Sequence, residues 1–281
     1  MCEAAAAYAV FALFGALPVG WASAAGAALG GVVGPLLPVH RRGLDNLARA
    51  LPELSPREVR RCARRMWCHL GRVAAEYPHI HRFRVDGRIE LVGRTHLDEA
   101  KRSANGGIFF SGHIGNWEIA ARAPEQTGVP AVAIYRAANN PIVDRLIERY
   151  RVTIAQRRVP KGADATREMV RALGAGHHVA LLVDQKLNTG IPVPFFGRDA
   201  MTAPAVATLA LRYDCPVWPV RVERLAGATF RITVYPKLAM PEEGTREERV
   251  RAITLAVNRV LEDWIRERPE QWLWLHRRWP N

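Results

Sequence analysis

From residue 89 onward, short apolar runs alternate along the chain with segments that carry a helical pattern. The runs are "IELVG", "GGIFFSG", "AVAIY", "HVALLVD" and "CPVWPVRV". Each is nearly continuous in apolar residues, which is typical of strands buried on both faces of a sheet. Helices are expected at 116–127, 140–150, 164–174, 202–212 and 245–267. This alternation predicts an α/β domain built on a mostly parallel or mixed sheet with flanking helices.

Two other segments have a clear periodicity. Residues 56–77 place apolar side chains at spacings of three and four, with arginines opposite. They predict an amphipathic helix that begins with Ser55 as N-cap and Pro56 as its first residue. "TFRITVYP" (229–236) alternates apolar and polar residues, as a half-exposed or edge strand would. No linker divides residues 40–281, so a single domain is expected there.

The N-terminal segment has no charged side chain between Ala4 and Leu37. It is too long for the core of a signal peptide and lacks a basic start, yet it is long enough for a spanning helix of about 20 residues. Pro18 predicts two shorter helices, so spanning the membrane, embedding in one leaflet and a buried hairpin all stay open. Arg41 and Arg42 follow at once and place the rest of the chain in the cytoplasm. Residues 1–39 are therefore expected to associate with the membrane and 40–281 to form the catalytic domain.

The charge of the chain points to an anionic partner. Forty Lys and Arg face 27 Asp and Glu, a formal net charge of +13. Such a surface attracts nucleic acid, anionic lipid or an acidic protein, and the apolar start favours the anionic membrane surface over nucleic acid. The four cysteines form no CxxC pair, which indicates a reduced setting without a zinc site. Neither a metal nor a cofactor is expected.

The stretch "SGHIGNWE" (111–118) follows the apolar run "GGIFF", at a strand end where α/β proteins place their chemistry. His113 and Glu118 can meet only if His113 precedes a helix and Glu118 lies in its first turn, with Asn116 as N-cap. A carboxylate on one imidazole nitrogen fixes the tautomer and makes the other nitrogen a general base. G-x-S-x-G and HExxH are both absent, which argues against a serine nucleophile and a zinc protease. The pair suits activation of a substrate hydroxyl for attack on an activated acyl group.

Three more stretches lie in the same order as in one known family: "YRAANNPIVDRLI" (135–147), "LLVDQKLNTGIPVPFFGR" (181–198) and "PEQWLWLHRRWP" (269–280). With "SGHIGNWE", they make the chain resemble the bacterial lipid A biosynthesis acyltransferases, a branch of the lysophospholipid acyltransferase superfamily with its H-x4-D/E motif. The resemblance implies acyl transfer from acyl carrier protein to a hydroxyl of a Kdo-bearing lipid A precursor. It also implies a place at the cytoplasmic face of the inner membrane.

Further candidate site residues lie in the matching stretches. Arg136 follows a strand, and the match favours a role as a bidentate clamp for a phosphate. Asp184 ends the run "HVALLV" and is expected to orient a group near the active site or Arg136. Gln185 and Lys186 supply an amide and a positive charge to the same cleft edge, where Lys186 would bind phosphate. Arg198 is expected at the substrate head group.

Two aromatic groups have a functional and a structural interpretation each. Phe195 and Phe196 either wall the acyl chain or pack in the core. The tail "QWLWLHRRW", with Trp272, Trp274 and Trp279, suits either a lipid interface or docking on the core.

Two alternative functions remain at this point. The acceptor could be another glycolipid or a lysophospholipid, as in the similar phosphatidylinositol mannoside acyltransferases. The chain could also be a non-catalytic module that binds a membrane surface or nucleic acid. The presence of His113, Glu118, Arg136 and Asp184 together favours an enzyme.

Overall fold

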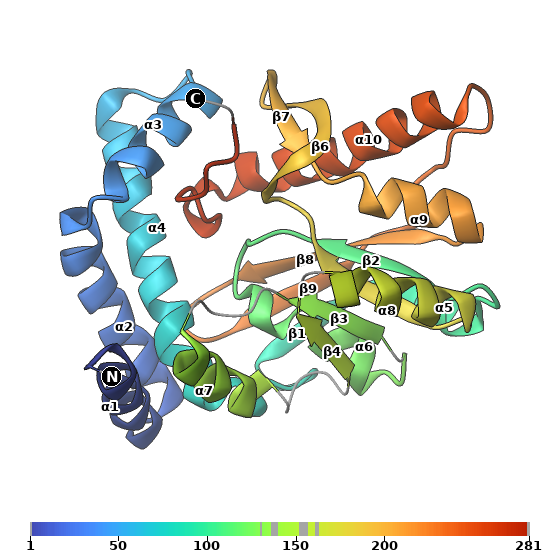
Figure 1. The fold of residues 1–281 in the computed structure, drawn as a ribbon. Helices are drawn as coiled ribbons and strands as arrows, with labels where there is room; N and C mark the ends of the chain where they lie inside the picture. Colours follow the sequence, from blue (N-terminus) through green and yellow to red (C-terminus); the bar gives the residue numbers. More distant parts are fainter. Residues whose placement is uncertain (1, 130, 136–139, 152–156, 161–162, 280–281) are drawn as a thin grey trace.

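The structure is a computed structural model that describes residues 2–129, 131–135, 140–151, 157–160 and 163–279. Its centre is a seven-stranded sheet in the order β1-β9-β8-β2-β5-β3-β4 (Figure 1). The strands are β1 (Ile89–Val92), β2 (Gly107–Ser111), β3 (Ala131–Tyr135), β4 (Arg157–Pro160), β5 (His178–Leu182), β8 (Val217–Arg224) and β9 (Phe230–Val234). Only β8 and β9 pair antiparallel among these neighbours, so the mixed sheet is confirmed.

Helices cover both faces of this sheet. They are α5 (Arg94–Arg102), α6 (Arg122–Gln126), α7 (Pro141–Arg151), α8 (Ala163–Gly174), α9 (Ala205–Tyr213) and α10 (Arg246–Glu267). Because side chains alternate along a strand, Ile108 and Phe110 of β2 join one core cluster with residues of α8, α9 and α10. Phe109 joins the opposite cluster with residues of α5 and α6. The α/β class is thus confirmed as a sheet between two helical layers.

The expected strands and helices are found, with two differences. The strand β9 alternates buried and half-buried residues as predicted, but it lies between β1 and β8 and is not an edge strand. The segment 116–127 is divided into a 3-10 turn, η3 (Trp117–Ile119), and the short α6. Gly115 adopts φ +57° just before this segment, and the chain turns sharply there.

The N-terminal segment folds into α1 (Cys2–Ala16) and α2 (Val19–Val33), divided at Pro18 as predicted. A short turn, η1 (Gly34–Leu36), and α3 (His40–Ala50) lead into α4 (Pro56–Glu76), which begins with a capping box between Ser55 and Glu58. After α4 the chain continues into the 3-10 turn η2 (Tyr77–Arg82). Figure 1 shows α1, α2 and α4 side by side at one end of the molecule.

Glycines bring α2 and α4 into close contact. A Cβ added to Gly26 would lie 2.4 Å from the carbonyl oxygen of Gly71, and one added to Gly71 would lie 2.0 Å from that of Gly26. Ser23 of α2 also donates a hydrogen bond to Glu76 of α4, which is fully buried and paired with Arg224. α2 is therefore part of the packed structure.

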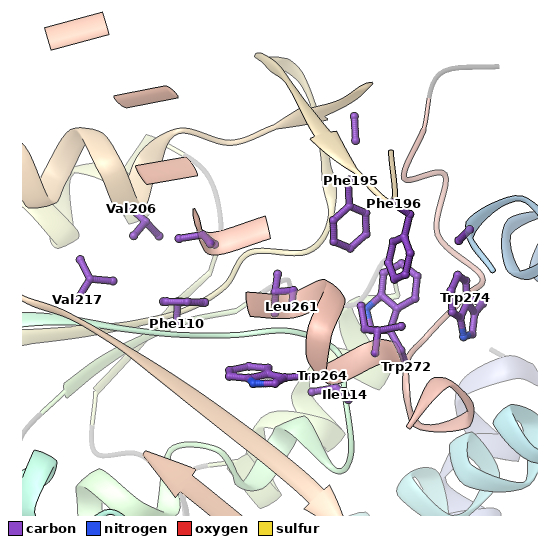
Figure 2. Close-up of a cluster of buried hydrophobic side chains, with 14 of the residues drawn as sticks. Phe110, Ile114, Phe195, Phe196, Val206, Val217, Leu261, Trp264, Trp272 and Trp274 are labelled. Atoms are coloured by element: carbon purple, nitrogen blue, oxygen red, sulfur yellow. The ribbon is translucent and has the colours of Figure 1, made fainter. Parts of the chain in front are cut away.

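A hairpin and the C-terminal tail complete the fold. β6 (Lys186–Phe195) and β7 (Arg198–Thr202) pair antiparallel, and a turn, η4 (Pro269–Gln271), follows α10. Phe195 and Phe196 of the hairpin pack against Trp272 and Trp274 of the tail (Figure 2). All four side chains are buried, and so is Trp279. Core packing is thus the observed role of these aromatic residues.

Candidate active site

The loop after β2 has a shape that only glycine allows at position 115. A Cβ there would lie 2.1 Å from the carbonyl oxygen of Val222. Ile114, the residue before it, forms an antiparallel bridge with Trp272, and the amide of Gly115 donates to the carbonyl of Gln271. The tail thus fixes the loop that carries His113 at the carboxyl end of β2.

His69 of α4 supports the same loop from the other side. Its Nε2 lies 3.0 Å from the carbonyl oxygen of Gly115, and its Nδ1 accepts a hydrogen bond from Arg224. The imidazole is therefore neutral and protonated on Nε2. Burial, together with the charge of Arg224, lowers the pKa of His69 to about 3.

His113 is paired with Asp184, at the carboxyl end of the neighbouring strand β5. The Nδ1 atom of His113 lies 2.7 Å from Oδ1 of Asp184, and the backbone amide of His113 donates to Oδ2 at 2.8 Å. Trp272 donates its indole N–H to the same Oδ2 at 2.7 Å. Burial alone would raise the pKa of Asp184, but the charge of His113 and the hydrogen bonds from the side chain and backbone of His113 outweigh it and hold that pKa well below its usual range. A charged Asp184 fixes the proton of His113 on Nδ1 and leaves Nε2 as a base.

Glu118 has a different partner from the one expected from the sequence. Its carboxylate binds Arg151 of α7 through two hydrogen bonds, at 2.8 Å from Nε to Oε2 and 2.7 Å from Nη2 to Oε1. Trp117 donates a further hydrogen bond to Oε1. Burial would raise the pKa of Glu118, but the hydrogen bonds and charge of Arg151 prevail and lower it. The carboxylate that binds the imidazole of His113 is thus that of Asp184, and Glu118 binds a cation.

The physical reason for this difference is the local backbone. Asn116 precedes the turn η3 but does not cap it with its side chain, which instead donates to Glu76. Glu118 lies in a 3-10 turn that directs its carboxylate to α7. Nη2 of the same Arg151 also donates a hydrogen bond to the hydroxyl of Tyr77, at 3.2 Å.

A largely apolar pocket of about 840 Å³ adjoins His113. Ligand sites commonly have roughly 300–1,000 Å³. Its walls come from β2, β3 and β5 and from α6, α8 and α9, and many of the lining residues are small: Ala120, Ala121, Ala131, Ala133, Ala165, Ala180, Ala203 and Ala205. His113, Glu118, Arg151 and Gln185 lie at the same pocket. The pocket follows the strands from their carboxyl ends to Val129 and His177 near their amino ends.

Of the other described residues expected at the site, the structure places only Gln185 in the pocket. Gln185 lines the pocket, with its amide nitrogen 3.3 Å from Nε2 of His113. Lys186 follows as the first residue of β6 and is half-buried, outside the lining of the pocket. Arg198 begins β7, where its guanidinium lies 5.2 Å from the ring centre of Trp279. Arg136 lies outside the described residues.

His276, like Arg151, is a residue near the site that the sequence did not indicate. Its ring centre lies 5.1 Å from that of His113, although 163 positions separate the two residues (276 − 113). A histidine in a tail of aromatic and basic residues carries no spacing signal that would place it there. His113, Asp184 and His276 also have the residue types and proximity of a metal site. However, Asp184 already accepts three hydrogen bonds from His113 and Trp272, so its carboxylate is poorly placed as a free ligand.

The structure is thus an α/β fold in which a histidine–carboxylate pair adjoins a largely apolar pocket. The chain belongs to the bacterial lipid A biosynthesis acyltransferases, since the model of that family matches residues 4–281. It is also similar to the lipid A biosynthesis lauroyltransferase of Escherichia coli (strain K12), with 27% identity over 254 residues that cover 85% of this chain and 77% of the relative. The chain is therefore an acyltransferase of lipid A biosynthesis, as the four ordered sequence motifs predicted.

Proposed function

We propose that the chain transfers a fatty acyl group from acyl carrier protein to a hydroxyl of a Kdo-bearing lipid A precursor, with His113 as general base. The observation that carries the proposal is the hydrogen bond of 2.7 Å between Nδ1 of His113 and Asp184, beside the apolar pocket. Nε2 of His113 takes the proton of the acceptor hydroxyl, and that oxygen attacks the carbonyl carbon of the thioester. The C–S bond breaks, and the thiolate receives the proton from Nε2. In this proposal Asp184 orients the base, the role that the sequence suggested for Glu118.

The pocket is proposed to hold the acyl chain. Its alanine-rich walls leave room between the strands and helices, and apolar surface favours burial of a hydrocarbon chain over contact with water. The pocket reaches His113, so a chain that lies in it would end with its carbonyl carbon near the base.

The proposed donor is acyl carrier protein because that partner is small and strongly acidic. A formal charge of +13 on this chain would speed their encounter, and the rate would fall with ionic strength. The test is turnover with acyl carrier protein and coenzyme A thioesters of equal chain length across a salt series. Preference for the protein donor that weakens with salt supports the assignment. Equal rates with both donors, independent of salt, contradict it.

The acceptor assignment follows the family and the relative, which is a lipid A biosynthesis lauroyltransferase. Mass spectrometry of membrane lipids from cells with and without the gene tests it. Loss of one secondary acyl chain from lipid A, restored by the wild-type gene and not by His113→Ala, supports the proposal. Intact lipid A with a change in another glycolipid would favour the alternative acceptor class.

We further propose that α1 and α2 lie on the cytoplasmic leaflet of the inner membrane and do not cross it. The segment Val19–Leu36 is long and apolar enough to span by length and composition. Large apolar side chains are exposed along it and on α1, including Leu13, Trp21, Leu29, Val32 and Leu36. However, α2 packs on α4, whose outer side exposes Arg57, Arg60, Arg61, Arg64 and Arg65. Arginines of this kind are costly in hydrocarbon and favourable at an anionic head-group layer.

Liposome binding tests this arrangement. Trp21→Ser with Leu36→Ser should weaken binding to anionic vesicles without loss of the folded domain, because both side chains are more than 70% exposed. If the double variant binds as the wild type does, this surface is not the membrane contact.

A further inference from the structure

The C-terminal tail is tied to the active site by hydrogen bonds at several points. Trp272 donates to Asp184, and the amide of Leu273 donates to the carbonyl of His113. From the other side, Asn46 of α3 donates its side-chain amide to the carbonyls of Trp274, at 2.7 Å, and His276, at 2.8 Å. The tail is therefore held between Trp272 and His276 by contacts with the active-site loop, Asp184 and α3.

The side chains of His276 and His113 both contact Gln185. The amide nitrogen of Gln185 lies 3.3 Å from Nε2 of His113 and 3.5 Å from Nε2 of His276. The two rings meet edge to face, with an angle of 69° between their planes. One atom at the position of the Gln185 nitrogen thus contacts both ε nitrogens at once.

We propose that His276 positions the acceptor hydroxyl for attack, an inference that rests on His113 as the base. The hydroxyl oxygen displaces the Gln185 amide from between the two rings. Once the amide has left, the hydroxyl donates its proton to Nε2 of His113 and accepts a hydrogen bond from His276 in the tautomer that carries its proton on Nε2. Because the oxygen is held from two sides, one of its lone pairs faces the thioester carbonyl while the proton leaves. No new covalent step is added to the transfer reaction.

This arrangement also gives Gln185 a function in the absence of acceptor. Its amide donates to Nε2 of His113, so that nitrogen stays unprotonated and the proton stays on Nδ1, where it is donated to Asp184. The amide therefore preserves the reactive tautomer until the hydroxyl arrives.

The test compares His276→Gln with His276→Ala in the purified full-length enzyme, using an acyl carrier protein thioester and a Kdo-bearing lipid A precursor as probes. His276→Ala is expected to lower kcat/KM for the acceptor roughly 10- to 100-fold, the scale of a small misplacement of a reacting group. His276→Gln retains an N–H near the position of Nε2, so it is expected to recover most of this loss. The KM for the donor should stay unchanged in both variants. His96→Ala on α5, where the histidine pairs with Glu99, is the matched control.

Two results would overturn the inference. One is an acceptor kcat/KM within twofold of the wild type in His276→Ala. The other is an equal loss in both variants that follows a fall in Tm, since it would assign His276 a structural role. Failure of the base assignment is detected separately, because His113→Ala would then keep its turnover whatever His276 does.

Discussion

Arg151 binds the carboxylate of Glu118 with two nitrogens, at 2.8 Å and 2.7 Å, in a setting where both side chains are at least 85% buried. The guanidinium also lies 5.1 Å from the ring centre of Tyr135. All three residues line the apolar pocket, so the pair joins α7 to the loop that carries His113. Glu118 is thereby part of the pocket wall, while Asp184 binds the imidazole.

The buried pair leads to a prediction about stability. Glu118→Ala leaves Arg151 as a buried cation without this carboxylate, and loss of one partner of such a pair costs roughly 3–5 kcal/mol of unfolding free energy. The double variant Glu118→Ala with Arg151→Ala should recover part of that loss, because the unpaired charge is gone. Chemical denaturation of the four proteins gives the coupling energy. A Glu118→Ala protein as stable as the wild type would contradict a buried ion pair here.

Removal of the base should abolish turnover and leave the fold intact. In His113→Ala, the buried Asp184 keeps its hydrogen bonds from the backbone amide at position 113 and from the indole of Trp272, so its carboxylate is not left without partners. We expect a loss of at least about 10²-fold in kcat, the usual contribution of a general base. Single-turnover transfer and a thermal melt are the two measurements. Near-normal transfer in a well-folded variant would exclude His113 as the base.

Substitutions in the pocket should change the preferred acyl chain. Ala133 and Ala131 line the pocket on one face of β3, and Ala133 lies beside Ala180 in the neighbouring strand. A larger side chain fills space that the acyl chain would use. Ala131 lies further than Ala133 from the carboxyl end of β3, so a substitution there blocks a deeper part of the pocket. Ala133→Phe should therefore favour shorter chains than Ala131→Phe does. Competition among thioesters of several lengths measures this, and an unchanged preference in both variants would place the acyl chain elsewhere.

The buried His69 predicts a pH dependence of stability. Its pKa is about 3 in the folded protein and near 6.5 when unfolded. The unfolded state therefore binds more protons between these values, so the stability that is present above pH 6.5 is lost as the pH falls towards 3. The slope reaches at most about 1.4 kcal/mol per pH unit. His69→Gln retains a donor for Gly115 and removes the titration, so its unfolding free energy should fall less between pH 7 and pH 4.5. Parallel curves for the two proteins would show that His69 does not contribute.

Much of the fold was predictable because local signals agreed with it. Pro18 divided the apolar start, and Ser55 with Glu58 began α4 where the capping box indicated. The strand β4 was missed because "RRVP" carries two arginines and resembles a surface segment. The 10-residue strand β6 was missed as well, since its prolines and glycine argue against a strand.

The site was predictable only in part, for a reason of topology. The sequence indicated His113 and Asp184 as site residues because each follows an apolar run that was expected to form a strand. Their contact depends on β2 and β5 being neighbours, and the order of strands in a sheet is not encoded by local spacing. Sequence proximity instead favoured Glu118, five residues away. The contribution of the tail, through Trp272 and His276, depends on contacts over long sequence distances and left no local pattern.

The central claim is that Asp184, and not Glu118, orients the catalytic imidazole. The most direct measurement is single-turnover acyl transfer by Asp184→Asn and Glu118→Gln, each at saturating donor and acceptor and each verified as folded by its Tm. The structure predicts that Asp184→Asn loses at least about 10²-fold in rate, because the asparagine amide no longer provides a charged partner for Nδ1–H. Glu118→Gln, which still offers Arg151 an oxygen, should retain a rate within about tenfold of the wild type. A large loss in Glu118→Gln together with a nearly normal rate in Asp184→Asn would contradict the claim.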